Sequence, residues 1–211
     1  MKKFTHDEIA ARIARDIPDG SYVNIGIGLP TRVANFLPPD REIVLQSENG
    51  ILGMGPTPPA GEEDPDLINA SKLPVSAVTG AAYFHHGDSF AMMRGGHLDF
   101  CILGGFQVSE TGDLANWHTG APGAIPAVGG AMDLAIGARH VYVMMEHTTK
   151  TGESKIVRQC TYPLTGLACV DRIYTDLAVI DVGPRGLEVV EIVDGLTLAE
   201  LQRLTGATLH G

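Results

Sequence analysis

Hydrophobic positions in the first part of the chain follow helical spacing. Isoleucine recurs every fourth residue from Ile9 to Ile17. Thr5 with Glu8 three residues later forms a capping box in front of this run. A Pro-Asp-Gly turn at 18–20 interrupts the pattern. The spacing therefore predicts a helix that begins after Thr5 and ends before residue 18.

Short apolar runs bounded by turn residues predict strands along the rest of the chain. The predicted strands are 22–25, 43–46, 75–78, 100–103, 141–145, 177–182 and 187–192. Shorter segments with helical character lie between or after them, at 33–37, 89–94, 131–138 and 197–204. Strands and helices alternate, so we expect an α/β fold. It should be a single domain over residues 1–211 with a largely parallel sheet flanked by helices.

The segment 53–66 breaks this alternation. It holds four prolines and four acidic residues, which favours a loop. A loop of this length is longer than a simple connection needs, so a functional role is favoured.

One carboxylate occupies a notable position in the pattern. Glu48 follows the predicted strand 43–46 and is followed at once by the turn residues Asn49 and Gly50. Ligands of α/β sheets bind in the crevice beyond the carboxyl ends of the strands. A glutamate in a turn is also common as a solvated side chain. Spacing alone leaves both interpretations open.

Composition restricts the class of protein. With 211 residues and 44% hydrophobic content, the chain can bury one full core. It has no apolar run long enough for a transmembrane helix. Charged residues close to the N-terminus interrupt any signal-peptide pattern, so we expect a cytoplasmic protein. The three cysteines lack metal-binding spacing and are expected to be free buried thiols.

The formal net charge of −10 argues against nucleic acid as a partner, because phosphate neutralisation needs clustered lysine and arginine. No membrane partner is expected either. A small anionic ligand is still compatible with this charge, since backbone amides and a few local cations can bind phosphate groups.

The loop 26–31 offers a rival hypothesis. Gly26 and Gly28 follow a predicted strand, and Glu48 lies at the end of the next one, which imitates a dinucleotide-binding fingerprint. Thr31 stands where the third glycine of that motif is needed. A nicotinamide-dependent oxidoreductase is therefore an alternative function. A non-catalytic ligand-sensing domain is another, although it would have no need for a carboxylate at the strand end.

Two adjacent histidines suggest a metal site at first sight. His85 and His86 lie close to Asp88. Adjacent residues of a strand point to opposite faces, so the two histidines are poorly placed to bind one ion. We expect no metal.

Four blocks of the sequence, in this order, resemble the β subunit of the class I CoA-transferases. They are the Ser-Glu-Asn-Gly stretch at 47–56, Arg-Gly-Gly-His-Leu at 94–98, Gly-Asp-Leu-Ala-Asn-Trp at 112–117 and Gly-Gly-Ala-Met-Asp-Leu at 129–134. The likeness extends over nearly the whole chain. It implies the α/β architecture of that family.

The resemblance also implies site residues. In the family, the glutamate of the Ser-Glu-Asn-Gly motif forms a thioester with CoA, a role that falls on Glu48. Gly130 matches a glycine whose amide lies close to the thioester carbonyl. Further candidates for oxyanion or CoA binding are Gly129, Gly28, Asn49 and Gly50, the last two of which could instead shape the turn.

The family implies ligands and partners as well. A CoA thioester is the substrate, and no permanently bound cofactor is expected. The active enzyme combines this type of subunit with a homologous α subunit, as a heterodimer or an α2β2 heterotetramer.

Segments 118–128 and 144–155 are more similar to the 3-oxoadipate CoA-transferases of aromatic catabolism than to the acetoacetate enzymes. We therefore expect CoA transfer from succinyl-CoA to 3-oxoadipate, with acetoacetate as the alternative acceptor. A second carboxylate on the acceptor requires one more cation or amide donor. The candidates are Arg94, His118 or a residue of the α subunit. Arg94 could alternatively pair with the acidic loop 53–66.

Overall fold

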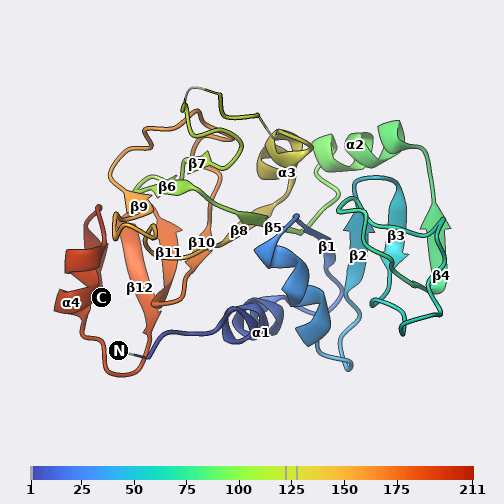
Figure 1. Cartoon of the computed structure of the whole chain (residues 1–211), viewed down its shortest axis with the longest axis horizontal. Helices are drawn as coiled ribbons and strands as arrows, with labels where there is room; N and C mark the ends of the chain where they lie inside the picture. The colour runs from blue at the N-terminus through green and yellow to red at the C-terminus, as the bar shows by residue number, and fades with distance from the viewer. Residues whose placement is uncertain (1, 122, 127) are drawn as a thin grey trace.

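Ten strands form one continuous sheet in the computed structural model, which describes residues 2–121, 123–126 and 128–211 (Figure 1). Their order across the sheet is β13-β12-β11-β10-β8-β5-β1-β2-β3-β4. The bounds are β1 Tyr22–Ile25, β2 Val44–Ser47, β3 Ile51–Met54, β4 Ala77–Tyr83, β5 Phe100–Gly104, β8 His140–Met144, β10 Arg172–Tyr174, β11 Ala178–Gly183, β12 Gly186–Ile192 and β13 Leu209–His210.

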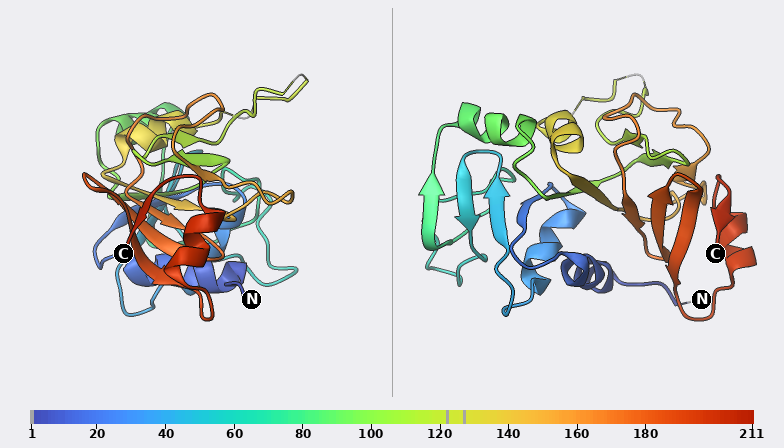
Figure 2. Two further views of the ribbon diagram at one scale, coloured as in Figure 1. Left: turned by 90° about the vertical axis from the view of Figure 1, so that its left-hand side faces the viewer. Right: turned by 180° about the vertical axis from the view of Figure 1, so that it is seen from behind.

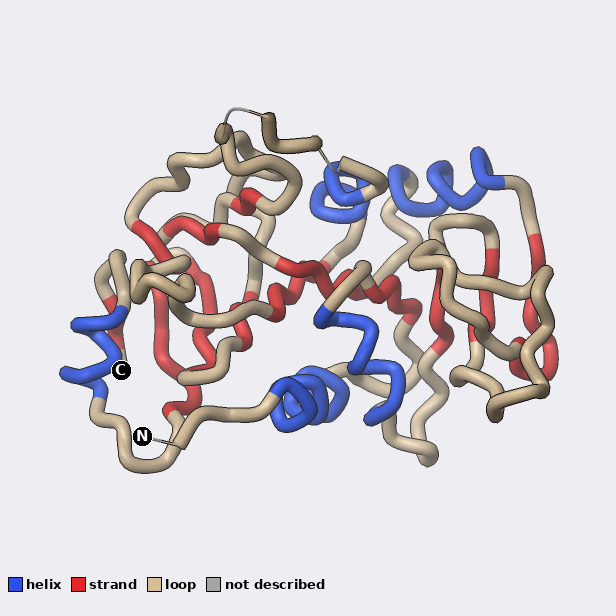
Figure 3. The backbone as a smooth tube through the Cα atoms, in the orientation of Figure 1, coloured by secondary structure: helices blue, strands red, loops and turns tan. Residues whose placement is uncertain are grey.

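A smaller sheet and five helical segments complete the fold. The small sheet has the order β7-β6-β9, with bounds β6 Gln107–Ser109, β7 Leu114–Ala115 and β9 Ile156–Val157. The helical segments are α1 His6–Asp16, the 3₁₀ helix η1 Leu29–Phe36, α2 His86–Arg94, α3 Ala131–Gly137 and α4 Leu198–Leu204. Figure 3 shows that long loops join many of these short elements.

The centre of the large sheet is parallel. Strands β10, β8, β5, β1 and β2 all run in the same direction. On either side the sheet continues with antiparallel pairs, which are β2 with β3 and β4, and β10 with β11 and β12. The expected α/β fold with a parallel sheet is confirmed for the central strands, whereas the flanks are antiparallel. Parallel strands align their carboxyl ends along one edge, and this positions the site.

Helices cover the central strands from two sides. α1 and η1 pack together on one side, and α2 and α3 lie on the other (Figures 1 and 2). The core between these layers includes Ile9 and Ile13 of α1, Met93 of α2 and Leu134 of α3, all of them buried. The predicted capping box of α1 is present, because Thr5 Oγ1 accepts from the amide of Glu8 and the Glu8 carboxylate accepts from the amide of Thr5.

Several elements differ from the prediction. The strand expected at 75–78 lies further along, at β4. Its residues are small and it is an edge strand with mostly exposed side chains, so the apolar pattern is weak there. β3 begins directly after the turn at 48–50 and shortens the loop expected at 53–66. The helix expected at 33–37 is the longer 3₁₀ helix η1.

The cysteines are free, as expected. Cys101 is buried and Cys160 and Cys169 are half-buried. Burial raises the pKa of the Cys160 and Cys169 thiols to about 11. Among the residues that the structure describes, no helix has the length and hydrophobicity needed to cross a membrane.

Candidate active site

Glu48 is the first residue after β2 and lies at the carboxyl end of that strand. β2 pairs in parallel with β1, so both strands end at the same edge of the sheet. The Glu48 side chain is half-buried at this edge. Glu48 therefore lies where an α/β sheet places its ligand crevice.

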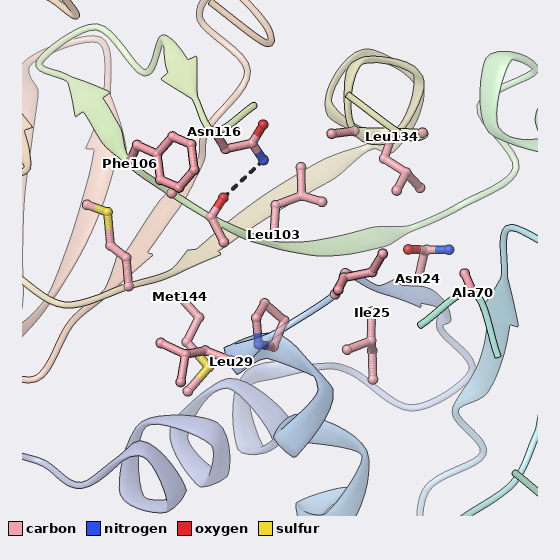
Figure 4. A pocket seen from close by; sticks show the side chains of 18 of the residues that line it. Asn24, Ile25, Leu29, Ala70, Leu103, Phe106, Asn116, Leu134 and Met144 are labelled. Carbon is pink, nitrogen blue, oxygen red and sulfur yellow. Dashed lines mark hydrogen bonds between the residues drawn. The ribbon is translucent and has the colours of Figure 1, made fainter. Parts of the chain in front are cut away.

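A cavity of about 350 Å³ opens beside Glu48 (Figure 4). Most of its wall is apolar. Figure 4 shows this wall, formed by Ile25 of β1, Leu29 of η1, Leu103 of β5, Leu134 of α3 and Met144 of β8. Five elements from distant parts of the sequence thus enclose the space next to one carboxylate.

Six polar or charged side chains line the same cavity: Asn24, Ser47, Glu48, Asn116, Glu146 and Lys155. The Asn116 side-chain amide donates to the Gly104 carbonyl at 3.0 Å, which fixes its orientation (Figure 4). An apolar cavity with a few convergent polar groups is the usual form of a small-molecule site.

Gly130 lies directly against the Glu48 carboxylate. A Cβ atom built at Gly130 would lie 2.2 Å from Glu48 Oε2 and 3.2 Å from Phe90 Cζ. Such a distance is too short for any side chain, so only glycine fits here. The neighbouring Gly129 also lines the cavity and has a φ of +48°, a conformation that favours glycine. The glycine pair and Glu48 come together as the resemblance implied.

A buried polar network lies behind Glu48. The Asn24 side-chain amide donates to the Gln46 side chain and to the Gln46 carbonyl. The Gln46 amide in turn donates to Ser89 Oγ at 2.6 Å. All three side chains are buried. The network ties β1, β2 and α2 together and gives the Glu48 turn a rigid base.

The residues that follow Glu48 shape the turn. Gly50 has a φ of +113°, and a Cβ atom there would lie 2.2 Å from the Phe84 carbonyl oxygen. The Asn49 side-chain amide donates to the Ile68 carbonyl at 2.7 Å. Neither residue lines the cavity beside Glu48. Of the two roles left open by the sequence, the geometry favours turn formation for both.

Gly28 and Gly26 are separated by the structure. Gly26 lines the Glu48 cavity, and its amide donates to the Ile102 carbonyl at 2.8 Å. Gly28 has a φ of +88° and lines a neighbouring cavity of about 470 Å³ together with Thr31. The loop leads into a 3₁₀ helix, unlike the α-helix that opens a dinucleotide-binding motif.

Arg94 is paired away from the cavity. Its Nε donates to Asp133 Oδ1 at 2.6 Å and so joins α2 to α3. This hydrogen bond raises the pKa of the exposed guanidinium. The suggested pairing with the acidic loop 53–66 is wrong, because the partner carboxylate belongs to α3. Arg94 does not line the Glu48 cavity.

His118 is engaged by its own loop. Its Nδ1 accepts from the Gly120 amide at 2.9 Å, and its Nε2 lies 3.2 Å from the Ala124 carbonyl oxygen. Both ring nitrogens are therefore used locally. His118 also packs against Trp117, and it does not line the Glu48 cavity.

The adjacent histidines have separate roles. His85 Nδ1 accepts from the Gly87 amide at 3.0 Å and caps α2. His86 packs against the Phe90 ring. Within the described residues, no group of three or more histidine, cysteine or acidic side chains is arranged to bind a metal ion.

Four cavity residues were not identified from the sequence: Asn24, Asn116, Glu146 and Lys155. Asn24 carries a usable signal, because an asparagine inside an otherwise apolar strand needs buried hydrogen-bond partners. Lys155 carries none, since it lies in a polar stretch that is typical of an ordinary surface loop.

Comparison with known proteins assigns this arrangement. Residues 6–203 match the family described as Coenzyme A transferase. The chain belongs to the coenzyme A transferase family. This assignment confirms the predicted enzyme class, and it favours that class over the oxidoreductase and ligand-sensing alternatives.

Relatives of known name cover almost the whole chain. The B-type subunit of the 3-oxoadipate CoA-transferase of Acinetobacter baylyi is 66% identical over 207 residues, which are 98% of this chain and 95% of the relative. The protein of the same name from Pseudomonas putida is 66% identical over 99% of this chain and 97% of its own length. The B-type subunit of a probable succinyl-CoA:3-ketoacid coenzyme A transferase of Bacillus subtilis is 50% identical over 97% of this chain and 94% of the relative.

Solved structures of CoA-transferases share the fold. An acyl-CoA transferase from Escherichia coli O157:H7 superposes with a TM-score of 0.76 at 19% identity, over 98% of this chain and 42% of that chain. This coenzyme A transferase chain thus spans less than half of that enzyme. The glutaconate coenzyme A-transferase of Acidaminococcus fermentans gives a TM-score of 0.69 at 17% identity, over 99% of this chain and 86% of that one. Both likenesses support the expected architecture of the family.

Proposed function

We propose that this chain is the glutamate-bearing subunit of an enzyme that transfers CoA from succinyl-CoA to 3-oxoadipate, with Glu48 as the nucleophile. The observation that carries the proposal is the position of the Glu48 carboxylate, at a strand end, in the cavity and against Gly130. The names of the two relatives at 66% identity support 3-oxoadipate as the acceptor. The succinyl-CoA:3-ketoacid relative at 50% identity keeps acetoacetate as the second candidate.

The first half-reaction conserves the thioester energy in a covalent intermediate. A Glu48 carboxylate oxygen attacks the thioester carbonyl of succinyl-CoA and expels the CoA thiolate, leaving a succinyl-glutamyl anhydride. The thiolate then attacks the glutamyl carbonyl of the anhydride. Succinate leaves, and Glu48 carries CoA as a thioester.

The second half-reaction reverses these steps with the acceptor. The carboxylate of 3-oxoadipate next to the keto group attacks the glutamyl thioester and releases the thiolate, giving a second anhydride. The thiolate attacks its 3-oxoadipyl carbonyl, so that 3-oxoadipyl-CoA leaves and the Glu48 carboxylate is restored. A carboxylate nucleophile needs no general base, because it reacts in its ionised form. The site must instead stabilise the tetrahedral oxyanions.

Backbone amides close to Glu48 are the candidates for this stabilisation. Gly130 is favoured, because its backbone touches the carboxylate and leaves room for a reacting group in place of a side chain. Gly129 is next to it on the cavity wall. Gly28 lines the adjoining cavity and could contact CoA there. Asn49 and Gly50 contribute through the turn that presents Glu48.

The proposal includes a homologous α subunit, in a heterodimer or an α2β2 heterotetramer. The names of the relatives at 66% identity describe one lettered subunit of an enzyme, which supports a second type of subunit here too. The mouth of the cavity also carries exposed apolar side chains, which include Ile27 at 63% exposure and Phe106 at 40%. We expect the complex to act in the cytoplasm on small-molecule substrates.

Covalent trapping tests the role of Glu48. The chain is co-expressed with its α subunit, incubated with succinyl-CoA and treated with borohydride, which reduces a glutamyl thioester. Peptide mass spectrometry should find the reduced side chain at Glu48. The variant Glu48→Ala should give no labelled peptide and no CoA exchange. A reduced side chain at another residue, with Glu48 unmodified, would sink the mechanism.

A further inference from the structure

The acceptor proposed above carries a second carboxylate at C6, and the site needs a group that binds it. Of the two candidates in this chain suggested by the sequence, Arg94 is bonded to Asp133 and His118 to its own loop. Neither lines the cavity that contains Glu48. Among the described residues, Lys155 is the one cationic side chain on the wall of that cavity.

Lys155 is held on a rigid backbone. Its amide donates to the His147 carbonyl at 3.0 Å, and its own carbonyl accepts from the amide of Val108 at 3.0 Å. The next residue, Ile156, begins β9 and is fully buried. The stem of the lysine therefore starts from a fixed point between β6 and β8, across the cavity from β2.

The nearby carboxylates are occupied by other basic groups. Asp176 Oδ2 lies 2.6 Å from Lys3 Nζ, and Glu146 Oε1 lies 2.6 Å from His6 Nε2. In the described part of the chain, no carboxylate oxygen lies within 4.0 Å of Lys155 Nζ. Burial lowers the pKa of the Lys155 amine, although Glu146 and Asp176 partly oppose this. An ammonium that is buried without a close counter-ion gains from an incoming carboxylate.

Lys155 also lies at the boundary of two spaces. Both Lys155 and Phe106 line the Glu48 cavity and a neighbouring cavity that contains Thr149 and Tyr162. An acid that reaches from Glu48 toward this boundary would meet the ammonium at its far end.

We propose that Lys155 binds the distal carboxylate of 3-oxoadipate and thereby selects a dicarboxylic acceptor. This assignment rests on the proposed function. It makes Lys155 a specificity residue that contacts the substrate at the end remote from the reacting carbon. An ion pair of this kind in a desolvated cavity discriminates strongly against an acceptor that lacks the charge.

Two acceptors of equal length test the assignment. 3-Oxohexanoate has the chain length and keto group of 3-oxoadipate but ends in a methyl group. In a ping-pong scheme, kcat/KM for the acceptor reports only the second half-reaction. The complete enzyme should therefore be assayed with succinyl-CoA and each acceptor. In Lys155→Met, the ratio of kcat/KM for 3-oxoadipate over 3-oxohexanoate should fall by about 10²-fold.

Two further variants control the result. Lys155→Arg keeps a cation and should retain more of the ratio than Lys155→Met. Lys150→Met removes an exposed lysine of the preceding loop and should leave the ratio within about threefold of the wild-type value. An unchanged ratio in Lys155→Met, or an equal loss for both acceptors, overturns the assignment. Failure of the proposed function is a different result, namely a wild-type enzyme that transfers CoA to neither 3-oxoadipate nor acetoacetate.

Discussion

A Cβ atom at Gly130 would lie 2.2 Å from Glu48 Oε2, so the backbone at the start of α3 and the carboxylate at the end of β2 are in direct contact. The two residues are far apart in sequence, and the fold alone brings them together. A side chain at position 130 would occupy the space of the carboxylate or of the group that reacts with it.

The first prediction follows from this contact. Gly130→Ala should lower kcat of the complete enzyme by about 10²-fold, because the added methyl group displaces the Glu48 carboxylate by an ångström or more. Gly130 has a φ of −87°, which alanine adopts without strain, so the fold should persist. Steady-state kinetics and circular dichroism measure the two effects.

A second glycine provides the control for this experiment. Gly183 has open space around a built Cβ atom and lies in β11, away from the cavity. Gly183→Ala should therefore leave kcat unchanged. Wild-type activity in Gly130→Ala would show that the contact with Glu48 has no part in the reaction.

The second prediction concerns the length of the nucleophile. Glu48→Asp keeps the charge but shortens the side chain by one methylene, which withdraws the attacking oxygen from the Gly130 backbone. We expect a loss of about 10²-fold in kcat, because misplacement by about 1 Å costs this much in a preorganised site. The glutamyl-CoA thioester should form more slowly in single-turnover experiments. Thioester formation at the wild-type rate would contradict the prediction.

Local patterns were sufficient to predict parts of this molecule. The isoleucine spacing and capping box of α1 are contained within a few turns of helix, and the structure confirms both. Glu48 was found because an apolar strand and a turn motif adjoin it in sequence. Such features depend on neighbouring residues and are therefore visible before folding.

Other parts depend on contacts between distant segments. Strands of two or three residues, such as β7 and β9, have no periodicity of their own and exist because they pair with β6. Lys155 belongs to a polar loop, and only the packing of β9 against β6 brings it to the cavity. The role of Arg94 was open for the same reason, since its partner Asp133 is on another helix.

The third prediction uses a buried histidine beside the cavity wall. His147 is fully buried, and its ring nitrogens lie 3.0 Å from Thr175 Oγ1 and 2.9 Å from Thr205 Oγ1. Burial lowers its pKa from 6.5 to about 4. The unfolded chain therefore takes up a proton between these values that the folded chain does not. His147 contributes stability above pH 6.5, and this contribution is lost as the pH falls toward 4.

A pH series of urea titrations checks this effect. The shift corresponds to about 3 kcal/mol of unfolding free energy between pH 7 and pH 4. In His147→Gln, which cannot titrate, the decrease over the same range should be smaller by about this amount. Parallel decreases in the two proteins would mean that His147 is not responsible for acid sensitivity.

The last prediction concerns the partner subunit. Ile27 lines the mouth of the Glu48 cavity and is 63% exposed in this chain. An exposed isoleucine at the entrance of a site is expected to be covered in the complete enzyme, since stable subunit interfaces contain a core of buried apolar side chains. Ile27→Asp should therefore weaken the affinity for the α subunit at least about tenfold, because an aspartate loses its hydration in the interface.

Surface plasmon resonance with an immobilised α subunit measures this dissociation constant. Val190 of β12 is 52% exposed and does not line the cavity, so Val190→Asp provides a matched control that should bind like the wild type. High protein concentration should restore the activity of Ile27→Asp, because mass action repopulates the complex. Normal affinity with reduced activity would instead assign Ile27 to contact with substrate, and the docking surface would have to lie elsewhere on the chain.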